Sequence, residues 1–144
     1  MVISINVSLK KGTVKEPIDK IEIIKGFGLK GDAHGGNWHR QVSLLSYESF
    51  LKFKEDVKID LHYGVFGENL LVSEVDLKNV RVGDLIKINK VILRVTQIGK
   101  LCHKSCEIRE IVGNCIMPSE GIFAEVVEGG SIKVGDSVCI EPMC

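Results

Sequence analysis

Short segments rich in valine and isoleucine recur along the whole chain, and glycine, aspartate and asparagine separate them. Valine and isoleucine favour strands, whereas the separating residues favour turns. Some of the segments also alternate apolar and polar residues with a period of two, as half-buried strands do. The pattern predicts strands at residues 2–7, 20–24, 41–45, 69–72, 85–88, 91–96, 123–127 and 138–140.

Signals for helices are fewer. Ser46 can cap a helix over residues 47–54, which carries an apolar face. A second helix is predicted over residues 103–112. Residues 89–90 fit the turn of a two-residue hairpin between two predicted strands. Many short strands with few helices predict a mainly β fold, in the form of a small mixed-strand β-barrel with about two short helices.

The chain has 144 residues, the size of one domain, and no Pro- or Ser-rich linker divides it, so we expect a single domain over residues 1–144. Its formal net charge is zero, which argues against a nucleic-acid partner held by bulk charge. Its apolar runs are far shorter than the roughly 20 residues that span a membrane. We therefore expect a cytoplasmic protein that binds neither membranes nor nucleic acids.

The chain has five cysteines, which all lie in its last third: Cys102, Cys106, Cys115, Cys139 and Cys144. A secreted disulfide scaffold would have an even number, spread along a shorter chain. We expect reduced thiols, of which Cys102 is the reactive one. It follows a predicted strand and precedes a predicted helix, and the basic residues beside it favour the thiolate. The role of Cys106, one helical turn later, stays open between a resolving thiol and packing.

Residues 28–41 combine glycines with histidines and both signs of charge. Lys30 and Arg40 can hold a phosphate or a carboxylate, and His34 adds a further polar group. The segment matches neither a Walker loop nor a dinucleotide fingerprint, so it does not predict nucleotide binding. The alternative is a solvated loop with ordinary turn glycines. A zinc site is not expected, because the chain has no second cysteine pair and no HExxH helix.

Several runs of the chain together resemble the MOSC family, named for the C-terminal domain of molybdenum cofactor sulfurases. They occur in the order in which the family has them and cover most of the chain. The matching runs are residues 28–34 and 40–45, Phe66-Gly67-Glu68-Asn69-Leu70, residues 82–84 and 95–97 leading to Cys102, residues 121–124, Gly129-Gly130 and residues 134–136.

The resemblance implies a β-barrel and a role around the molybdenum cofactor, a pterin dithiolene with a phosphate. The family's hallmark cysteine falls on Cys102, which the resemblance makes a persulfide carrier in sulfurase members and the molybdenum ligand in reductase members. Leu101 stands where many members have proline. Three basic side chains are then expected to neutralise the cofactor phosphate, namely Lys30, His34 and Arg40. Three further side chains are expected to bond the pterin edge or to brace their own loops, namely Asp32, Gln41 and Asn69.

The first functional hypothesis is a sulfur carrier. Cys102 accepts sulfane sulfur from a separate cysteine desulfurase and delivers it to the metal cofactor of a molybdoenzyme acceptor. The second is a molybdenum-cofactor-dependent reductase of N-hydroxylated compounds, which needs an electron-donor protein because the chain has no flavin or iron–sulfur motif. The third is a barrel that binds a pterin or an anion without turnover.

Overall fold

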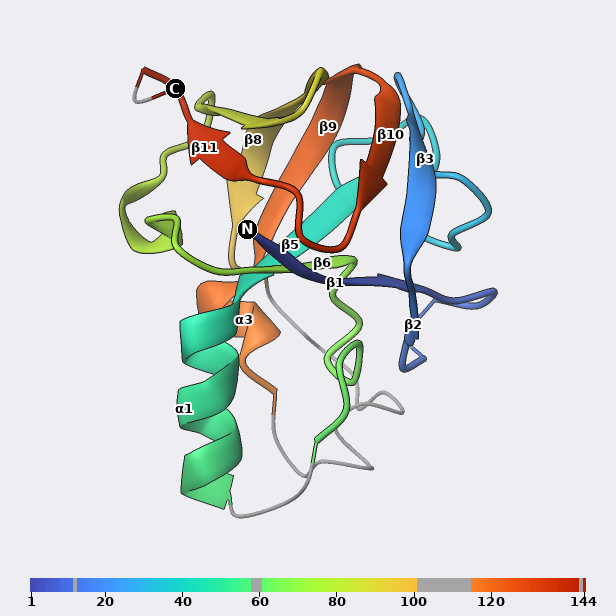
Figure 1. Ribbon diagram of the computed structural model, residues 1–144. Coiled ribbons are helices and arrows are strands. Elements are labelled where there is room, and N and C mark those ends of the chain that lie inside the picture. The colour runs from blue at the N-terminus through green and yellow to red at the C-terminus, as the bar shows by residue number, and fades with distance from the viewer. Residues whose placement is uncertain (12, 58–60, 101–114, 143) are drawn as a thin grey trace.

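The computed structural model describes residues 1–11, 13–57, 61–100, 115–142 and 144. Figure 1 shows strands gathered in the upper part of the molecule, with two helices at one end of them. The main sheet has eight strands in the order β11-β7-β8-β9-β5-β6-β1-β2. Its bounds are β1 Val2–Val7, β2 Glu16–Ile18, β5 Val42–Ser46, β6 Leu70–Val72, β7 Leu85–Ile88, β8 Val91–Ile98, β9 Ile122–Glu128 and β11 Val138–Ile140.

A second sheet has three strands in the order β10-β3-β4. It consists of β3 (Lys20–Ile24), β4 (Gly28–Leu29) and β10 (Gly130–Lys133). The helices are α1 (Tyr47–Val57), α3 (Met117–Glu120) and a single 3₁₀ turn, η1 (Leu77–Asn79). The mainly β class is thereby confirmed. Both sheets keep open edges within the described residues, so the barrel is a loose description of two facing sheets rather than a closed cylinder.

Strands β5 and β6 form the centre of the molecule. They pair in parallel, whereas the other described strand pairs are antiparallel. Val42 and Leu44 of β5 face the core between the two sheets, and Leu45 faces a second core beneath α1 and α3. Because both faces of these strands are buried, their residues are valine and leucine apart from Ser43 and Ser46.

Local sequence signals placed α1 and the hairpin correctly. The Ser46 hydroxyl accepts a hydrogen bond from the Ser49 N–H at 3.2 Å, which confirms the predicted cap. Asn89 has a φ of 54°, and Ile88 pairs with Val91, so a two-residue turn joins β7 to β8. The second predicted helix, over residues 103–112, lies outside the described residues. No helix in the described part of the chain is both long and apolar enough to cross a membrane.

The expectation of reduced thiols is wrong for two cysteines. Cys139 in β11 and Cys144 form a disulfide, with their Cα atoms 5.5 Å apart. That separation lies in the range that a disulfide requires. The expectation rested on a reducing compartment and on the odd number of cysteines. Neither of these reveals that the C-terminal tail folds back onto β11.

Candidate functional site

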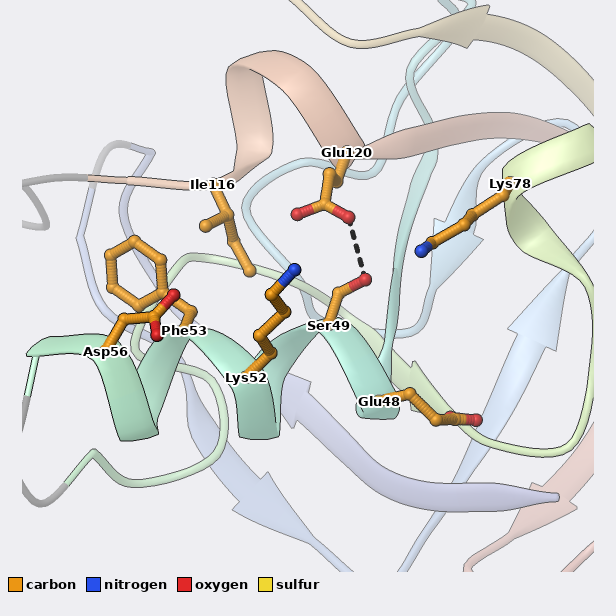
Figure 2. A pocket seen from close by; sticks show the side chains of 8 residues that line it. All are labelled: Glu48, Ser49, Lys52, Phe53, Asp56, Lys78, Ile116 and Glu120. Atoms are coloured by element: carbon orange, nitrogen blue, oxygen red, sulfur yellow. Dashed lines mark hydrogen bonds between the residues drawn. The ribbon is translucent and has the colours of Figure 1, made fainter.

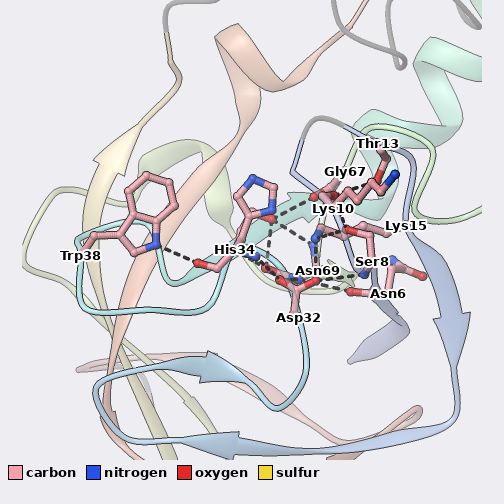
Figure 3. Close-up of polar contacts among 11 residues, drawn as sticks. Asn6, Ser8, Lys10, Thr13, Lys15, Asp32, His34, Trp38, Gly67 and Asn69 are labelled. Carbon is pink, nitrogen blue, oxygen red and sulfur yellow. Dashed lines mark hydrogen bonds and ion pairs between the residues drawn. The ribbon is translucent and has the colours of Figure 1, made fainter.

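A buried ion pair joins three loops at one side of the main sheet (Figure 3). The Lys15 Nζ lies 2.6 Å from the Asp32 Oδ1, and neither side chain is exposed to solvent. Lys15 follows the loop after β1, and Asp32 lies in the loop between β4 and β5. The Lys15 ammonium also donates to the Ser8 hydroxyl at 3.1 Å. Sequence reasoning missed Lys15, because nothing local distinguishes a buried lysine from the exposed lysines around it.

The Asp32 carboxylate uses all of its acceptor positions inside the protein. Its Oδ1 accepts from the Ser8 N–H at 3.0 Å as well as from Lys15. Its Oδ2 accepts from the His34 N–H at 3.2 Å and from the Asn69 Nδ2 at 3.0 Å. Burial alone would raise the pKa of Asp32, but the Lys15 ammonium, the Asn69 amide and the Ser8 N–H hold it below its ordinary value. Asp32 is therefore an ionised carboxylate that holds these loops together, and four hydrogen-bond donors occupy its acceptor positions.

Asn69 and Gln41 are also bound within the fold. Asn69 is fully buried, donates to the Asn6 carbonyl and Asp32, and accepts from the Ser43 N–H at 2.9 Å. The Gln41 Oε1 accepts from the Val126 N–H at 2.8 Å and so ties the start of β5 to β9. The sequence left two roles open for both residues, namely bonding the pterin edge and bracing their own loops. These contacts favour the second role.

His34 lies beside the ion pair and stacks on the only tryptophan of the chain. Its ring is nearly parallel to Trp38, at 8°, with the ring centroids 6.3 Å apart, and its carbonyl accepts from the Trp38 Nε1 at 2.7 Å. Burial, followed by the charge of Lys15, lowers the pKa of His34 to about 4. The imidazole is therefore neutral at pH 7, and its buried Nδ1 has no hydrogen-bond partner among the described residues.

Arg40 lies between two aromatic rings. Its guanidinium carbon is 4.7 Å from the centroid of Trp38 and 5.5 Å from that of Phe123. The Lys11 Nζ lies 4.7 Å from the Trp38 centroid, and the Lys100 Nζ lies 5.9 Å from the Phe123 centroid. Such cation–π contacts hold the charges in place without neutralising them. The Arg40 Nε is buried and has no partner in the described part of the chain.

These side chains form what we call the cationic cluster: the cations Lys11, Arg40 and Lys100 around the neutral His34, with Lys15 buried beneath them. Because His34 is neutral at pH 7, it can bond a phosphate but does not neutralise one, contrary to the expectation from the sequence. The structure thus brings together two of the three predicted phosphate ligands, His34 and Arg40. The third, Lys30, is exposed on the turn after β4, and its side chain has no contact with the cluster that the structure shows. Cys102 lies outside the described residues, but Lys100, two residues before it in the sequence, belongs to the cluster.

Glu68 is a fully buried carboxyl group near the ion pair. It accepts from the Gly64 N–H at 2.9 Å and from the Phe66 N–H at 3.1 Å. Burial raises the pKa of Glu68 to about 7, although these two hydrogen bonds and the charge of Lys15 oppose the rise. Its motif stood out in the sequence, but its burial did not. Among the described residues, no group of three or more His, Cys, Asp or Glu side chains could hold a metal ion.

A separate hollow of about 350 Å³ lies between α1 and α3 (Figure 2). The Ser49 hydroxyl donates to the Glu120 Oε1 there at 2.7 Å, and Lys52 and Lys78 point toward the same space. None of the residues that line this hollow belongs to the cationic cluster. We place the candidate site at the cluster, because the cluster has buried polar atoms without partners and this hollow has none.

Comparisons with known proteins place these observations in a family. The family model described as MOSC domain matches residues 30–139. An uncharacterized protein of Bacillus subtilis (strain 168), YflK, is 24% identical over an alignment of 137 residues that covers 88% of this chain. The chain spans only 62% of the length of that curated relative.

Solved structures with the same fold come from several bacteria. The YuaD protein from Bacillus subtilis superposes with a TM-score of 0.77 at 19% identity, over 95% of this chain and 92% of its own. YiiM from Geobacillus stearothermophilus superposes with a TM-score of 0.73 at 18% identity, over 97% of this chain and 74% of its own. At such identities these likenesses establish the fold alone.

Proposed function

The chain belongs to the MOSC domain family, and from this premise we propose that it is a sulfur carrier that works with the molybdenum cofactor. MOSC domains are associated in general with binding of that cofactor. In this proposal the cationic cluster holds the cofactor phosphate, and Cys102 carries sulfane sulfur as a persulfide. The observation that carries the proposal is the cluster itself, whose cations lie over aromatic rings and pair with no carboxylate in the described part of the chain.

The residues present fit the anionic part of the cofactor. The Arg40 Nε and the His34 Nδ1 are buried polar atoms that find no partner among the described residues, and such atoms favour a site that a ligand completes. Arginine suits a phosphate because its planar fork offers two parallel donors. The molybdenum cofactor would supply a soft metal–sulfur centre when bound, and a cysteine thiolate is a matching soft ligand.

Contact of Asp32 and Asn69 with the pterin edge has less support. The hydrogen-bonding groups of these two side chains already bond each other and neighbouring loops. We propose that both residues, with Gln41, shape the site without touching the ligand. Lys30 stays a prediction as a phosphate ligand, because it is exposed and the structure shows no contact between its side chain and the cluster.

The proposed chemical step transfers one sulfur atom from a persulfide to the Cys102 thiolate. The Cys102 thiolate attacks the outer sulfur of a persulfide on a separate cysteine desulfurase. The new sulfur–sulfur bond forms as the old one breaks, and the desulfurase thiolate leaves. Lys100 favours the thiolate because it places a positive charge two residues away in the sequence. Delivery then passes the sulfur to a molybdoenzyme acceptor.

Intact-mass spectrometry tests this step. The purified chain is incubated with a cysteine desulfurase and cysteine, and we expect it to gain one sulfur atom that dithiothreitol removes. Cys102→Ser should abolish the gain, and the matched variant Cys115→Ser, which alters another cysteine later in the sequence, should retain it. A wild-type chain that gains no removable sulfur would contradict the proposal.

Metal and pterin analysis of the same preparations distinguishes the sulfur carrier from the second hypothesis, a molybdenum-cofactor-dependent reductase. Molybdenum and pterin that stay bound to a chain unable to accept sulfur would indicate the reductase, with Cys102 as the metal ligand. Release of both from a chain that accepts sulfur supports the carrier.

A further inference from the structure

We propose that Lys15 is the positioning residue of the cationic cluster: its buried ammonium fixes the Asp32 carboxylate and places a positive charge beside the His34 imidazole. The inference concerns the protein before any ligand binds, and it therefore goes beyond the proposed function. It assigns a role to a residue that no motif contains.

The contacts of Lys15 join the loop after β1, the loop between β4 and β5, and the turn before β6; Figure 3 shows the first two. Its ammonium pairs with Asp32 at 2.6 Å and donates to the Ser8 hydroxyl. Its main-chain N–H donates to the Gly64 carbonyl at 2.8 Å, which ties it to the turn that holds Glu68. Asp32 passes the constraint on, because it accepts from the main-chain N–H of His34.

A buried ion pair is not kept for stability alone. Removing two charges from water is costly, and an apolar pair of similar volume is often as stable. A pair with no exposed surface therefore needs another explanation. The pair lies beside His34 and beneath the cations of the cluster. We infer that it is kept because it sets both the geometry and the electrostatic field of the site.

The charged groups around His34 determine the sign of that field. Among the described residues, Lys15, Lys100 and Lys11 act against protonation of the imidazole, and Asp32 acts in favour of it. Trp38 covers one side of the ring. His34 thus meets a ligand as a neutral group with one donor and one acceptor, while Arg40 and the lysines match the ligand's charge.

This arrangement predicts a pH profile for anion binding. An ordinary histidine would take up a proton near pH 6.5 and would then strengthen anion binding on acidification. Here the histidine stays neutral, so affinity for an anion of constant charge should not rise between about pH 7.5 and 5.5 through this group. Sulfate is the suitable probe, because its charge is constant over that range.

The experiment follows the His34 ring by NMR during a pH titration and measures sulfate affinity at the two pH values. The chain has four histidines, and the His34→Asn variant assigns the signal. In the wild type we expect the protonation midpoint at about pH 4. In Lys15→Met the midpoint should move up toward its ordinary value, and sulfate affinity should become several-fold stronger at the lower pH.

A second variant keeps the test valid if the single variant unfolds. Lys15→Met combined with Asp32→Asn removes both charges, so no unpaired charge stays buried. We expect a smaller upward shift, because the loss of the carboxylate partly offsets the loss of the ammonium. Lys78→Met, at an exposed lysine in the separate hollow, is the matched control and should leave the midpoint unchanged.

Lys15 would be a packing residue only, and the inference overturned, if both variants fold and keep the wild-type midpoint and the wild-type sulfate profile. Neither readout involves sulfur transfer or the molybdenum cofactor. A failure of sulfur loading with a shifted midpoint would therefore reject the proposed function and leave this inference standing.

Discussion

Among single residues, Glu68 should make stability depend on pH. Its pKa is raised to about 7 in the folded protein, against an ordinary value of 4.5. Between these two values the folded state keeps a proton that the unfolded state has lost, so the contribution of Glu68 to stability falls as pH rises from 4.5 to 7. The full difference corresponds to about 3 kcal/mol. Glu68→Gln should abolish this slope, measured as the difference in urea unfolding free energy from the wild type at each pH. An unchanged slope in the variant would show that Glu68 is not the group that titrates.

His34 should give the opposite slope. Its pKa is lowered to about 4, so the unfolded state binds a proton first as the pH falls below 6.5, and stability is lost on acidification. The magnitude is again about 3 kcal/mol at most. The two slopes oppose each other between about pH 4.5 and 6.5, so wild-type stability should change little there. His34→Asn should expose the falling slope of Glu68 in the same urea measurements, and a flat profile in that variant would contradict the assignment.

Arg40 should carry much of the anion binding. Arg40→Met keeps much of the apolar contact with Trp38 and Phe123 but removes the forked charge. We expect sulfate affinity to fall by about tenfold, in line with the loss of one charge-assisted hydrogen bond of roughly 1.5 kcal/mol. Quenching of Trp38 fluorescence gives the affinity. The control is Arg94→Met, because Arg94 pairs with Glu125 on the surface of β8. Equal losses in the two variants would indicate a general charge effect.

At the level of elements, the turn before β6 depends on a close approach that only glycine allows. Gly64 has a φ of +90°, and a Cβ there would lie 2.3 Å from the Lys15 carbonyl oxygen. Gly83 has a similar φ of +99°, but a Cβ there would meet nothing within 4 Å. A residue with a Cβ would adopt an unfavourable positive φ at either position. Only at Gly64 would its Cβ also overlap with a neighbouring atom.

Alanine at these two positions separates the two effects. Gly83→Ala should destabilise the protein by about 1 kcal/mol, the cost of a left-handed conformation. Gly64→Ala should cost about 3 kcal/mol, because the Lys15 backbone must also move. Thermal and urea unfolding would measure both. Equal losses would mean that the loops relax freely and that Lys15 is not held at Gly64.

The elements that sequence reasoning missed are short and lack a local signal. Strand β2 contains Pro17, β4 has only two residues and begins at Gly28, and β10 begins at Gly130. Their strand state comes from pairing with distant partners, such as Ser131 of β10 with Glu22 of β3. By contrast, β1, β3, β7 and β11 have the predicted bounds, because valine or isoleucine recurs in each of them.

For the whole molecule, the single domain over residues 1–144 stays a prediction. The two sheets share one apolar core, to which β1, β5, β8 and β9 of the main sheet and β3 and β10 of the smaller sheet contribute. We therefore expect one cooperative unfolding transition, with Trp38 fluorescence and far-ultraviolet circular dichroism giving the same midpoint in urea. Two separate midpoints would show that the sheets unfold independently.

The amino-acid sequence by itself determined the mainly β class, the cap of α1, the hairpin turn and the membership of a family, because these depend on local propensity and on ordered motifs. Only the tertiary structure decided which polar groups are free to bind a ligand. Asp32 and Asn69 look like ligand-binding residues in the sequence, yet other loops saturate them, whereas Lys15 is inconspicuous and lies buried beneath the cluster. The reason is that hydrogen bonding and burial come from residues far apart in the chain, and no local pattern records them.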